Sequence, residues 1–234
     1  MDVRIGTSGY NYPEWKGTFY PLDIKPARML PYYAERFSTV EINATFYRMP
    51  TAATVERWEA AVPETFRFVL KAPQRITHVA RLVNVDGAVR TFCDTARLLR
   101  ARLGPLFFQL PPSFKKDAAR LGDLLVQLPP GVRAAFEFRH ASWFADDVYE
   151  RLRARNAALC IADTDEGGTP ATATADWGYL RLRAVDYTDA QLADWIATMR
   201  RIGGAWRDAF VFFKHEEQGT GPALAKRFEA LLTP

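Results

Sequence analysis

Residues 135–139 read Ala-Phe-Glu-Phe-Arg, a short apolar run that ends in a charged side chain. Seven further apolar runs end in a polar or charged residue: Val3-Arg4-Ile5-Gly6-Thr7, Val40-Glu41-Ile42-Asn43, Phe66-Arg67-Phe68-Val69-Leu70-Lys71, Leu106-Phe107-Phe108-Gln109, Ala158-Leu159-Cys160-Ile161-Ala162-Asp163, Tyr179-Leu180-Arg181-Leu182-Arg183 and Phe210-Val211-Phe212-Phe213-Lys214. Short apolar runs without strict apolar–polar alternation are typical of buried parallel strands. The eight runs therefore predict a parallel sheet.

The spacing of the runs predicts how the sheet closes. They begin about 30 residues apart, the length that one strand and one returning helix need. Most segments between them carry apolar residues at helical spacing, for example residues 89–103. Residues 164–177 are rich in Gly, Thr and Ala and lack that pattern, so the sixth crossover is expected to be a loop without a regular helix. We predict an α/β fold, a single TIM-like (β/α)8 barrel domain over residues 1–234.

Composition narrows the class of protein. The chain has 234 residues, of which 48% are hydrophobic and 25% charged, which is typical of a globular protein with a sizeable core. Its net charge of +4 is too small to hold a long nucleic acid by itself. Two cysteines suggest no disulfide framework, and no apolar stretch reaches the roughly 18 residues of a membrane span. No signal peptide is visible, so a cytoplasmic protein without a membrane partner is expected.

The polar ends of the strands predict where a site lies. Side chains alternate along a strand, so every second residue shares a face. Large apolar residues are expected to face the helices, which leaves these polar sets pointing into the barrel: Glu41 and Asn43; Glu137 and Arg139; Tyr179, Arg181 and Arg183. Four more polar residues stand at strand ends: Lys71, Gln109, Asp163 and Lys214. The carboxyl ends of barrel strands carry the chemistry in TIM-barrel enzymes.

The charges of this ring do not balance. Three acids face five bases, which leaves a surplus of two positive charges. An unpaired buried charge costs several kcal/mol, so the surplus favours a phosphate or carboxylate held by an arginine pair. The alternative is that the ions form interior salt bridges between barrel layers. Arg181, deepest in its strand, best fits that structural role, and Glu137 and Lys214 fit it least.

Histidines and aromatic residues add to the predicted rim. His78, His140 and His215 each follow a strand, and histidine transfers protons near neutral pH. Tyr47 and Trp143 also lie in rim segments, where rings can stack on a sugar or a nucleobase. The alternative for such aromatics is packing of the loops onto the barrel, and it is the better interpretation of the rings at positions 15 and 19.

A metal site is the weaker interpretation of the ring. Acids and histidines at strand ends can bind divalent ions, but here lysines and arginines surround them and oppose a cation. We therefore assign no metal ligand and no required cofactor, and keep a divalent metal as an alternative. The common phosphate-loop, dinucleotide, nucleophile-elbow and zinc-protease motifs are absent.

Several motifs together resemble one family over essentially the whole chain. They are Gly6-Thr7-Ser8-Gly9-Tyr10 with Trp15, Gly17 and Phe19-Tyr20-Pro21; Val40-Glu41-Ile42-Asn43-Ala44-Thr45-Phe46-Tyr47-Arg48; Phe68-Val69-Leu70-Lys71 with Ile76-Thr77-His78; Gln109-Leu110-Pro111-Pro112; and Glu137-Phe138-Arg139-His140 with Ser142-Trp143. The chain resembles the YecE-like family, known as domain of unknown function 72. The resemblance implies a TIM-barrel-like fold, sometimes grouped with sugar-isomerase-related proteins, and supplies no reaction.

The chain departs from the family pattern at two strands. The seventh reads Leu180-Arg181-Leu182-Arg183-Ala184, where Leu-Arg-Leu-His-Gly is more usual. The eighth ends in Phe213-Lys214-His215-Glu216, where many members have Phe-Asn-Asn. Both changes place charge on the rim, so the ligand of this chain is expected to differ from that of other members.

These observations predict an enzyme that performs acid–base chemistry, as an isomerase, lyase or hydrolase, on a small anionic, phosphorylated sugar-like or nucleoside-like substrate. The catalytic candidates are Glu41, Lys71, Glu137, His140 and Asp163. The substrate-binding candidates are Asn43, Tyr47, His78, Gln109, Arg139, Trp143, Arg183, Lys214 and His215. One alternative is a protein that binds nucleic acid or nucleotides, with or without metal-assisted phosphodiester cleavage. Another is an enzyme in which Lys71 or Lys214 forms a Schiff base.

Overall fold

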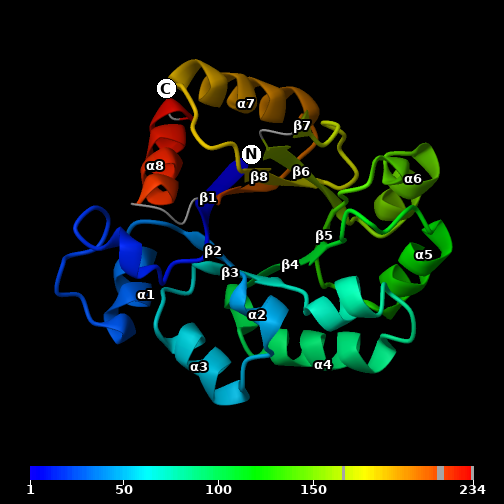
Figure 1. The fold of residues 1–234 in the computed structure, drawn as a ribbon, viewed down its shortest axis with the longest axis horizontal. Coiled ribbons are helices and arrows are strands. Elements are labelled where there is room, and N and C mark those ends of the chain that lie inside the picture. The colour runs from blue at the N-terminus through cyan, green and yellow to red at the C-terminus, as the bar shows by residue number, and fades with distance from the viewer. Residues whose placement is uncertain (165–166, 215–218, 233–234) are drawn as a thin grey trace.

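A closed parallel barrel forms the centre of the computed structural model, which describes residues 1–164, 167–214 and 219–232 (Figure 1). Its eight strands are β1 (Asp2–Ser8), β2 (Thr39–Ile42), β3 (Arg67–Lys71), β4 (Leu103–Gln109), β5 (Ala134–Glu137), β6 (Ala158–Thr164), β8 (Trp177–Leu182) and β9 (Asp208–Phe213). The order is β5-β4-β3-β2-β1-β9-β8-β6, and pairing of β5 with β6 closes the ring. The predicted (β/α)8 architecture is confirmed.

Helices surround the barrel and cover its outer face (Figure 1). They are α1 (Pro26–Ala34), α2 (Ala44–Tyr47), α3 (Ala52–Ala60), α4 (Asp86–Arg97), α5 (Ala118–Gln127), α6 (Asp146–Ala154), α7 (Asp189–Ile202) and α8 (Thr220–Leu232). Short helical turns are η1 (Pro13–Trp15), η2 (Arg75–Val79), η3 (Arg100–Arg102) and η4 (Ala141–Trp143). No helix in the described ranges combines the length and apolar character needed to cross a membrane.

The sixth crossover has no helix among its described residues, as predicted. It contains β7 (Gly167–Gly168), which pairs antiparallel with the end of β6. The remaining described residues run as a loop to β8, where the Thr174 hydroxyl donates to the Ala157 carbonyl and accepts from the Leu159 amide. Side-chain hydrogen bonds therefore hold this loop where a helix would otherwise pack.

The core consists of two layers separated by the sheet. The outer layer packs strands against helices. The inner layer fills the barrel, as in the stacked rings of Phe107 and Tyr179, whose centroids lie 5.2 Å apart. Val69, Phe107, Ala135 and Tyr179 all belong to it. Because strand side chains alternate, the residue two positions after each lies one layer nearer the mouth. Those residues are Lys71, Gln109, Glu137 and Arg181.

The aromatic residues of the first long loop pack onto the barrel. Trp15 is fully buried, with Tyr12, Phe19 and Tyr20 within 6.2 Å of it, centroid to centroid. The Tyr20 hydroxyl also donates to the Tyr10 carbonyl at 2.5 Å. Packing, rather than ligand stacking, therefore accounts for these rings.

Candidate active site

Glu137, the last residue of β5, is the centre of the polar layer and is almost completely buried. Its Oε1 accepts hydrogen bonds from Gln109 Nε2 at 2.7 Å and from Arg139 Nε at 2.8 Å. Its Oε2 accepts from Arg181 Nη1 at 2.5 Å, and Arg183 Nη1 lies 3.8 Å from Oε1. One carboxylate thus gathers three arginines at the mouth of the barrel.

Arg181 joins this carboxylate to a second one. Its Nη2 lies 2.9 Å from Glu41 Oε1, so the guanidinium bridges β5 and β2 through the barrel interior. Glu41 also accepts from the Ser8 hydroxyl at 2.7 Å and from the Tyr179 hydroxyl at 2.5 Å. Both carboxylates and the guanidinium are at most 2% exposed. Arg181 therefore forms the interior salt bridge that its depth in the strand suggested.

The charges around Glu137 decide its protonation state. Burial would raise the pKa of this carboxyl, but Arg181 and Arg139 outweigh that effect and lower the pKa to about 2. Burial raises the pKa of Tyr179 well above its ordinary value, and Glu41 adds to the rise. At neutral pH, Glu137 is therefore a fixed anion and Tyr179 a neutral hydrogen-bond donor.

Lys71 lies at the end of β3 in the same layer, and its environment differs from that of the arginines. The residue is 9% exposed, its Nζ donates to Gln109 Oε1 at 2.9 Å, and it sits 4.2 Å from the centroid of the Phe46 ring. No carboxylate of the described residues lies within salt-bridge distance of Nζ. Burial, reinforced by Arg181, lowers the pKa of Lys71 to about 8.

His78 stands beside Lys71 on the turn η2. Its ring packs edge-on against Phe46, with centroids 4.9 Å apart, and its Nδ1 is 2.8 Å from the Thr77 hydroxyl. Burial lowers the pKa of His78 below its usual 6.5, and the positive charges of Lys71 and Arg139 lower it further. Lys71 and His78 therefore both pack against the Phe46 ring, and the charges of Arg139 and Glu137 act on both.

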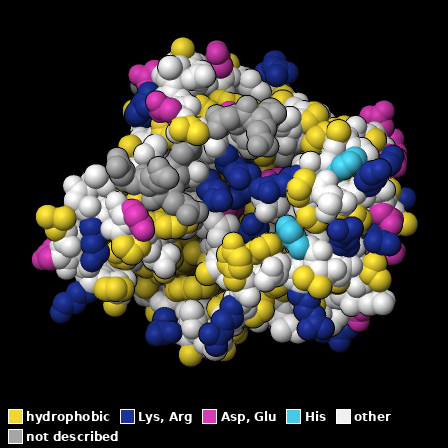
Figure 2. Space-filling model, viewed as in Figure 1, with side chains coloured by type: hydrophobic (Ala, Val, Ile, Leu, Met, Phe, Trp, Pro, Cys, Tyr) yellow, Lys and Arg dark blue, Asp and Glu magenta, His cyan; other side chains and the backbone are white. Residues whose placement is uncertain are grey.

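Arginines line the opening above this layer. The side chains of Arg139 and Arg183 are 33% and 21% exposed. Arg183 Nε is buried without an acceptor among the described residues, and Asn43 Oδ1 is likewise buried without a donor. Figure 2 shows Lys and Arg side chains gathered at the centre of this face, bordered by hydrophobic side chains. Tyr47 is 74% exposed and packs edge-on against Phe46.

Three of the candidate residues lie away from this group. Asp163 faces the helices and accepts hydrogen bonds from the Tyr187 hydroxyl and from Trp195 Nε1. Trp143 is fully buried, where Nε1 donates to the Phe114 carbonyl and the ring stacks on Phe138. It is therefore a packing residue that a ligand cannot reach. His140 Nδ1 lies 2.9 Å from the Ser142 hydroxyl and accepts from the Ser142 amide, so it caps η4.

The end of β9 is only partly described. Lys214 is partly exposed, and its backbone amide donates to the Leu182 carbonyl. His215 lies outside the described residues. The candidate residues named from the sequence include neither Ser8 nor Phe46, although the sequence places Phe46 among the rim aromatics. Ser8 could have been found from strand parity, because it shares a face with Gly6 at the end of β1.

Metal ligation finds no support in this arrangement. Among the described residues, no three His, Cys, Asp or Glu side chains converge as metal ligands would. The two acids of the layer, Glu41 and Glu137, already receive hydrogen bonds from arginine, tyrosine, serine and glutamine.

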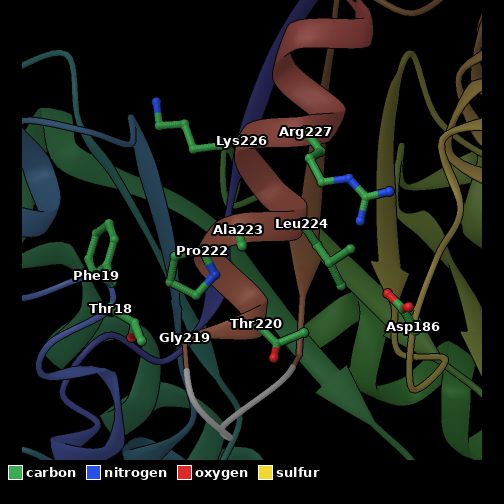
Figure 3. A pocket seen from close by; sticks show the side chains of 10 residues that line it. All are labelled: Thr18, Phe19, Asp186, Gly219, Thr220, Pro222, Ala223, Leu224, Lys226 and Arg227. Carbon is green, nitrogen blue, oxygen red and sulfur yellow. The ribbon is translucent and has the colours of Figure 1, made fainter.

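A pocket of about 360 Å³ lies elsewhere, beside the first turns of α8 (Figure 3). It is lined by Thr18, Phe19, Asp186, Gly219, Thr220, Pro222, Ala223, Leu224, Lys226 and Arg227. Arg227 is paired with Asp189, and none of the candidate site residues lines this pocket.

Comparison with known proteins identifies the family. The model of the family described as "Protein of unknown function DUF72" matches residues 4–234. UPF0759 protein YunF of Bacillus subtilis (strain 168) is 26% identical, over 98% of this chain and 94% of that protein. UPF0759 protein YecE of Escherichia coli (strain K12) is 33% identical over 64% of this chain and 53% of YecE.

Solved structures agree with the sequence comparison. The crystal structure of a DUF72 family protein from Thermotoga maritima is similar with a TM-score of 0.86 and 25% identity, and the match covers 100% of both chains. A DUF72 family protein from Enterococcus faecalis, 18% identical with a TM-score of 0.81, shares the fold. The chain thus belongs to the DUF72 family.

Proposed function

We propose that the chain is an enzyme whose barrel mouth binds a small anionic substrate, phosphorylated and sugar-like or nucleoside-like, and performs acid–base chemistry on it. The polar layer supports this proposal through its charges. With Lys71 protonated, four cations there face two buried carboxylates, which leaves a surplus of two positive charges. A bound anion would neutralise that surplus at a point shielded from water.

Arg183 carries the argument for anion binding. Its Nε–H is buried without an acceptor among the described residues, and its Nη1 lies 3.8 Å from Glu137 Oε1 rather than in close contact. A buried donor without a partner costs roughly 1–3 kcal/mol, and a substrate oxygen would remove that cost. Arg139 stands beside it, held through Nε by Glu137, and its side chain is 33% exposed. Two such guanidinium groups suit a phosphate or a carboxylate.

Lys71 is the best placed group for proton transfer. A general acid or base works best when its pKa is close to the working pH. The pKa of Lys71 is lowered to about 8, whereas that of Glu137 is lowered to about 2. We therefore assign proton transfer to Lys71, with His78 beside it, and assign to Glu137 the positioning of the arginines.

Thermal unfolding at constant ionic strength tests anion binding. The ligands are inorganic phosphate, pyruvate and ribose 5-phosphate, with uncharged ribose as the matched control. A ligand at 100 times its Kd stabilises the folded state by about 2.7 kcal/mol, which is a shift of several degrees in Tm. We expect at least one anion to raise the Tm of the wild-type protein and ribose to have no effect.

Two arginine variants give the test its specificity. Arg183→Gln should lose most of the anion-dependent shift. Arg97→Gln, at an exposed pair on α4, should keep it. The proposal fails if no anion protects the wild-type protein, or if both variants respond alike.

A further inference from the structure

We infer that Lys71 is a nucleophile that forms a Schiff base with the substrate, so that the substrate class is small anionic aldehydes and ketones. The inference rests on the proposed anion binding at the same mouth. It starts from a contrast among the cations of one buried layer. Arg139, Arg181 and Arg183 each have a Glu137 oxygen within 4 Å. Lys71 has instead a neutral amide oxygen and an aromatic ring.

This contrast matters because a carboxylate partner would hold the lysine in its charged form. An ammonium paired with a carboxylate in a buried site keeps its proton, since losing it would leave an unpaired anion. Gln109 and Phe46 carry no net charge, so the amine beside them can lose its proton without leaving one behind. The chain therefore places in this layer one buried amine that is free to become neutral.

The charges around Lys71 favour the neutral amine further. Burial disfavours the ammonium, Arg181 and Arg139 repel it, and the two acids only partly compensate, so the pKa falls to about 8. At pH 7.5 such a lysine is roughly 200-fold richer in neutral amine than an ordinary lysine of pKa 10.4. The titratable and charged groups around it, from β2, η2, β5 with the loop after it, and β8, are Glu41, His78, Glu137, Arg139 and Arg181.

The position of the amine also suits a carbonyl substrate. Nζ lies at the end of β3, 4.2 Å from the centroid of the Phe46 ring and 2.9 Å from Gln109 Oε1. His78 packs on the same ring and supplies a proton-transfer group beside the amine. An anionic group bound by Arg139 and Arg183 would leave the rest of a small molecule within this layer.

The step balances without a further reactant. The Lys71 ammonium first passes one proton to the neutral imidazole of His78. The neutral Nζ then attacks the carbonyl carbon, the C=O π pair moves to oxygen, and transfer of a proton from the nitrogen to that oxygen gives a carbinolamine. Protonation of its hydroxyl, for which His78 is placed, allows the C–O bond to break and water to leave. The nitrogen lone pair then forms the C=N bond. In sum, the lysine ammonium and the carbonyl compound yield a protonated imine and one water.

Reductive trapping tests the inference directly. The full chain is incubated with dihydroxyacetone phosphate and sodium borohydride, and its mass and its peptides are measured. We expect one adduct per chain, located at Lys71, at a yield at least tenfold above that of uncharged dihydroxyacetone. Lys71→Arg should abolish this adduct, and Lys116→Arg, at an exposed salt bridge to Asp147, should keep it. Labelling spread over surface lysines, with none at Lys71, would overturn the inference.

A second measurement keeps the two proposals distinguishable. Formaldehyde with cyanoborohydride methylates any accessible amine and needs no anion site. The methylation rate of Lys71 should be half-maximal close to pH 8, whereas surface lysines continue to gain rate up to about pH 10. If anions protect the protein but Lys71 reacts like a surface lysine or not at all, the Schiff base fails and anion binding stands. If Lys71 reacts as expected but no anion protects, anion binding fails.

Discussion

The carboxylate of Glu137 is buried among arginine side chains, so removing its charge should lower the stability of the folded protein. Glu137→Gln keeps the shape but leaves Arg139 and Arg181 without their shared anion. Removing one partner of a buried ion pair costs about 3–5 kcal/mol. Urea unfolding at pH 7 should show a loss of this size, whereas Glu150→Gln on the exposed face of α6 should change stability by less than about 0.5 kcal/mol.

The same carboxyl predicts an acid-dependent loss of stability. Its pKa is lower in the folded protein, about 2, than the ordinary 4.5. A lowered folded-state pKa adds stability above pH 4.5, and this contribution falls away as the pH drops from 4.5 to 2. It amounts to about 3 kcal/mol. Unfolding measured across this range should be steeper in the wild-type protein than in Glu137→Gln, and parallel curves would contradict this account.

Residue by residue, the site could be predicted where strand parity applies and not elsewhere. Parity identified Glu41, Glu137 and Arg181, and all three meet inside the barrel. Asp163 was included for its place at a strand end, although parity puts it on the same outer face as Ile161. Trp143 follows a strand too, but its place in the core depends on the distant Phe114 carbonyl, which no local pattern reveals.

The close packing of β1 against β2 predicts that a side chain added between these strands destabilises the protein. A Cβ added at Gly6 would lie 2.2 Å from the Thr39 carbonyl oxygen, so the two strands would have to move apart. Gly6→Ala should therefore destabilise the protein by more than about 2 kcal/mol. Gly87→Ala is the matched control, because nothing lies within 4 Å of its added Cβ in α4, and it should be neutral or stabilising by up to about 1 kcal/mol. Equal unfolding midpoints in urea would contradict the prediction.

Elements with a regular pattern are predictable, including α3 with its cap Thr51, whereas the short helix α2 and the turn η2 are not. The strands and long helices follow from apolar runs and helical spacing. The short helix α2 depends instead on Thr45, whose hydroxyl donates to the Lys71 carbonyl at 2.6 Å and lies 3.0 Å from the Ile42 carbonyl oxygen. The turn η2 ends where the Ala80 amide bonds to the Arg75 carbonyl. The Thr45–Lys71 bond joins parts of the chain 26 residues apart, which meet only when β2 and β3 have paired.

For the whole molecule, the two ends of the barrel should respond differently to substitution. At the end opposite the mouth, Arg133 binds both oxygens of Asp208, at 2.8 and 2.6 Å, and stacks on Trp177. Asp208→Asn should lower stability by about 1 kcal/mol, the upper range for a partly exposed pair. The Tm shift caused by anions should not change, because stability and function occupy opposite ends. A reduced shift in this variant would contradict that separation.

The ion pairs of Arg181 with Glu41 and Glu137 also have a consequence for folding during synthesis on the ribosome. Glu41 and Glu137 leave the ribosome well before Arg181, which is encoded 140 residues after the first and 44 after the second. Until then Glu41 has no cationic partner among the described residues and Glu137 has only the partly exposed Arg139, so a half-built barrel would have to keep Glu41 in water or protonated. The nascent chain should therefore stay open to chaperones and proteases until β8 emerges. Ribosome-bound chains that stop before that strand should be digested far faster than chains that extend beyond it.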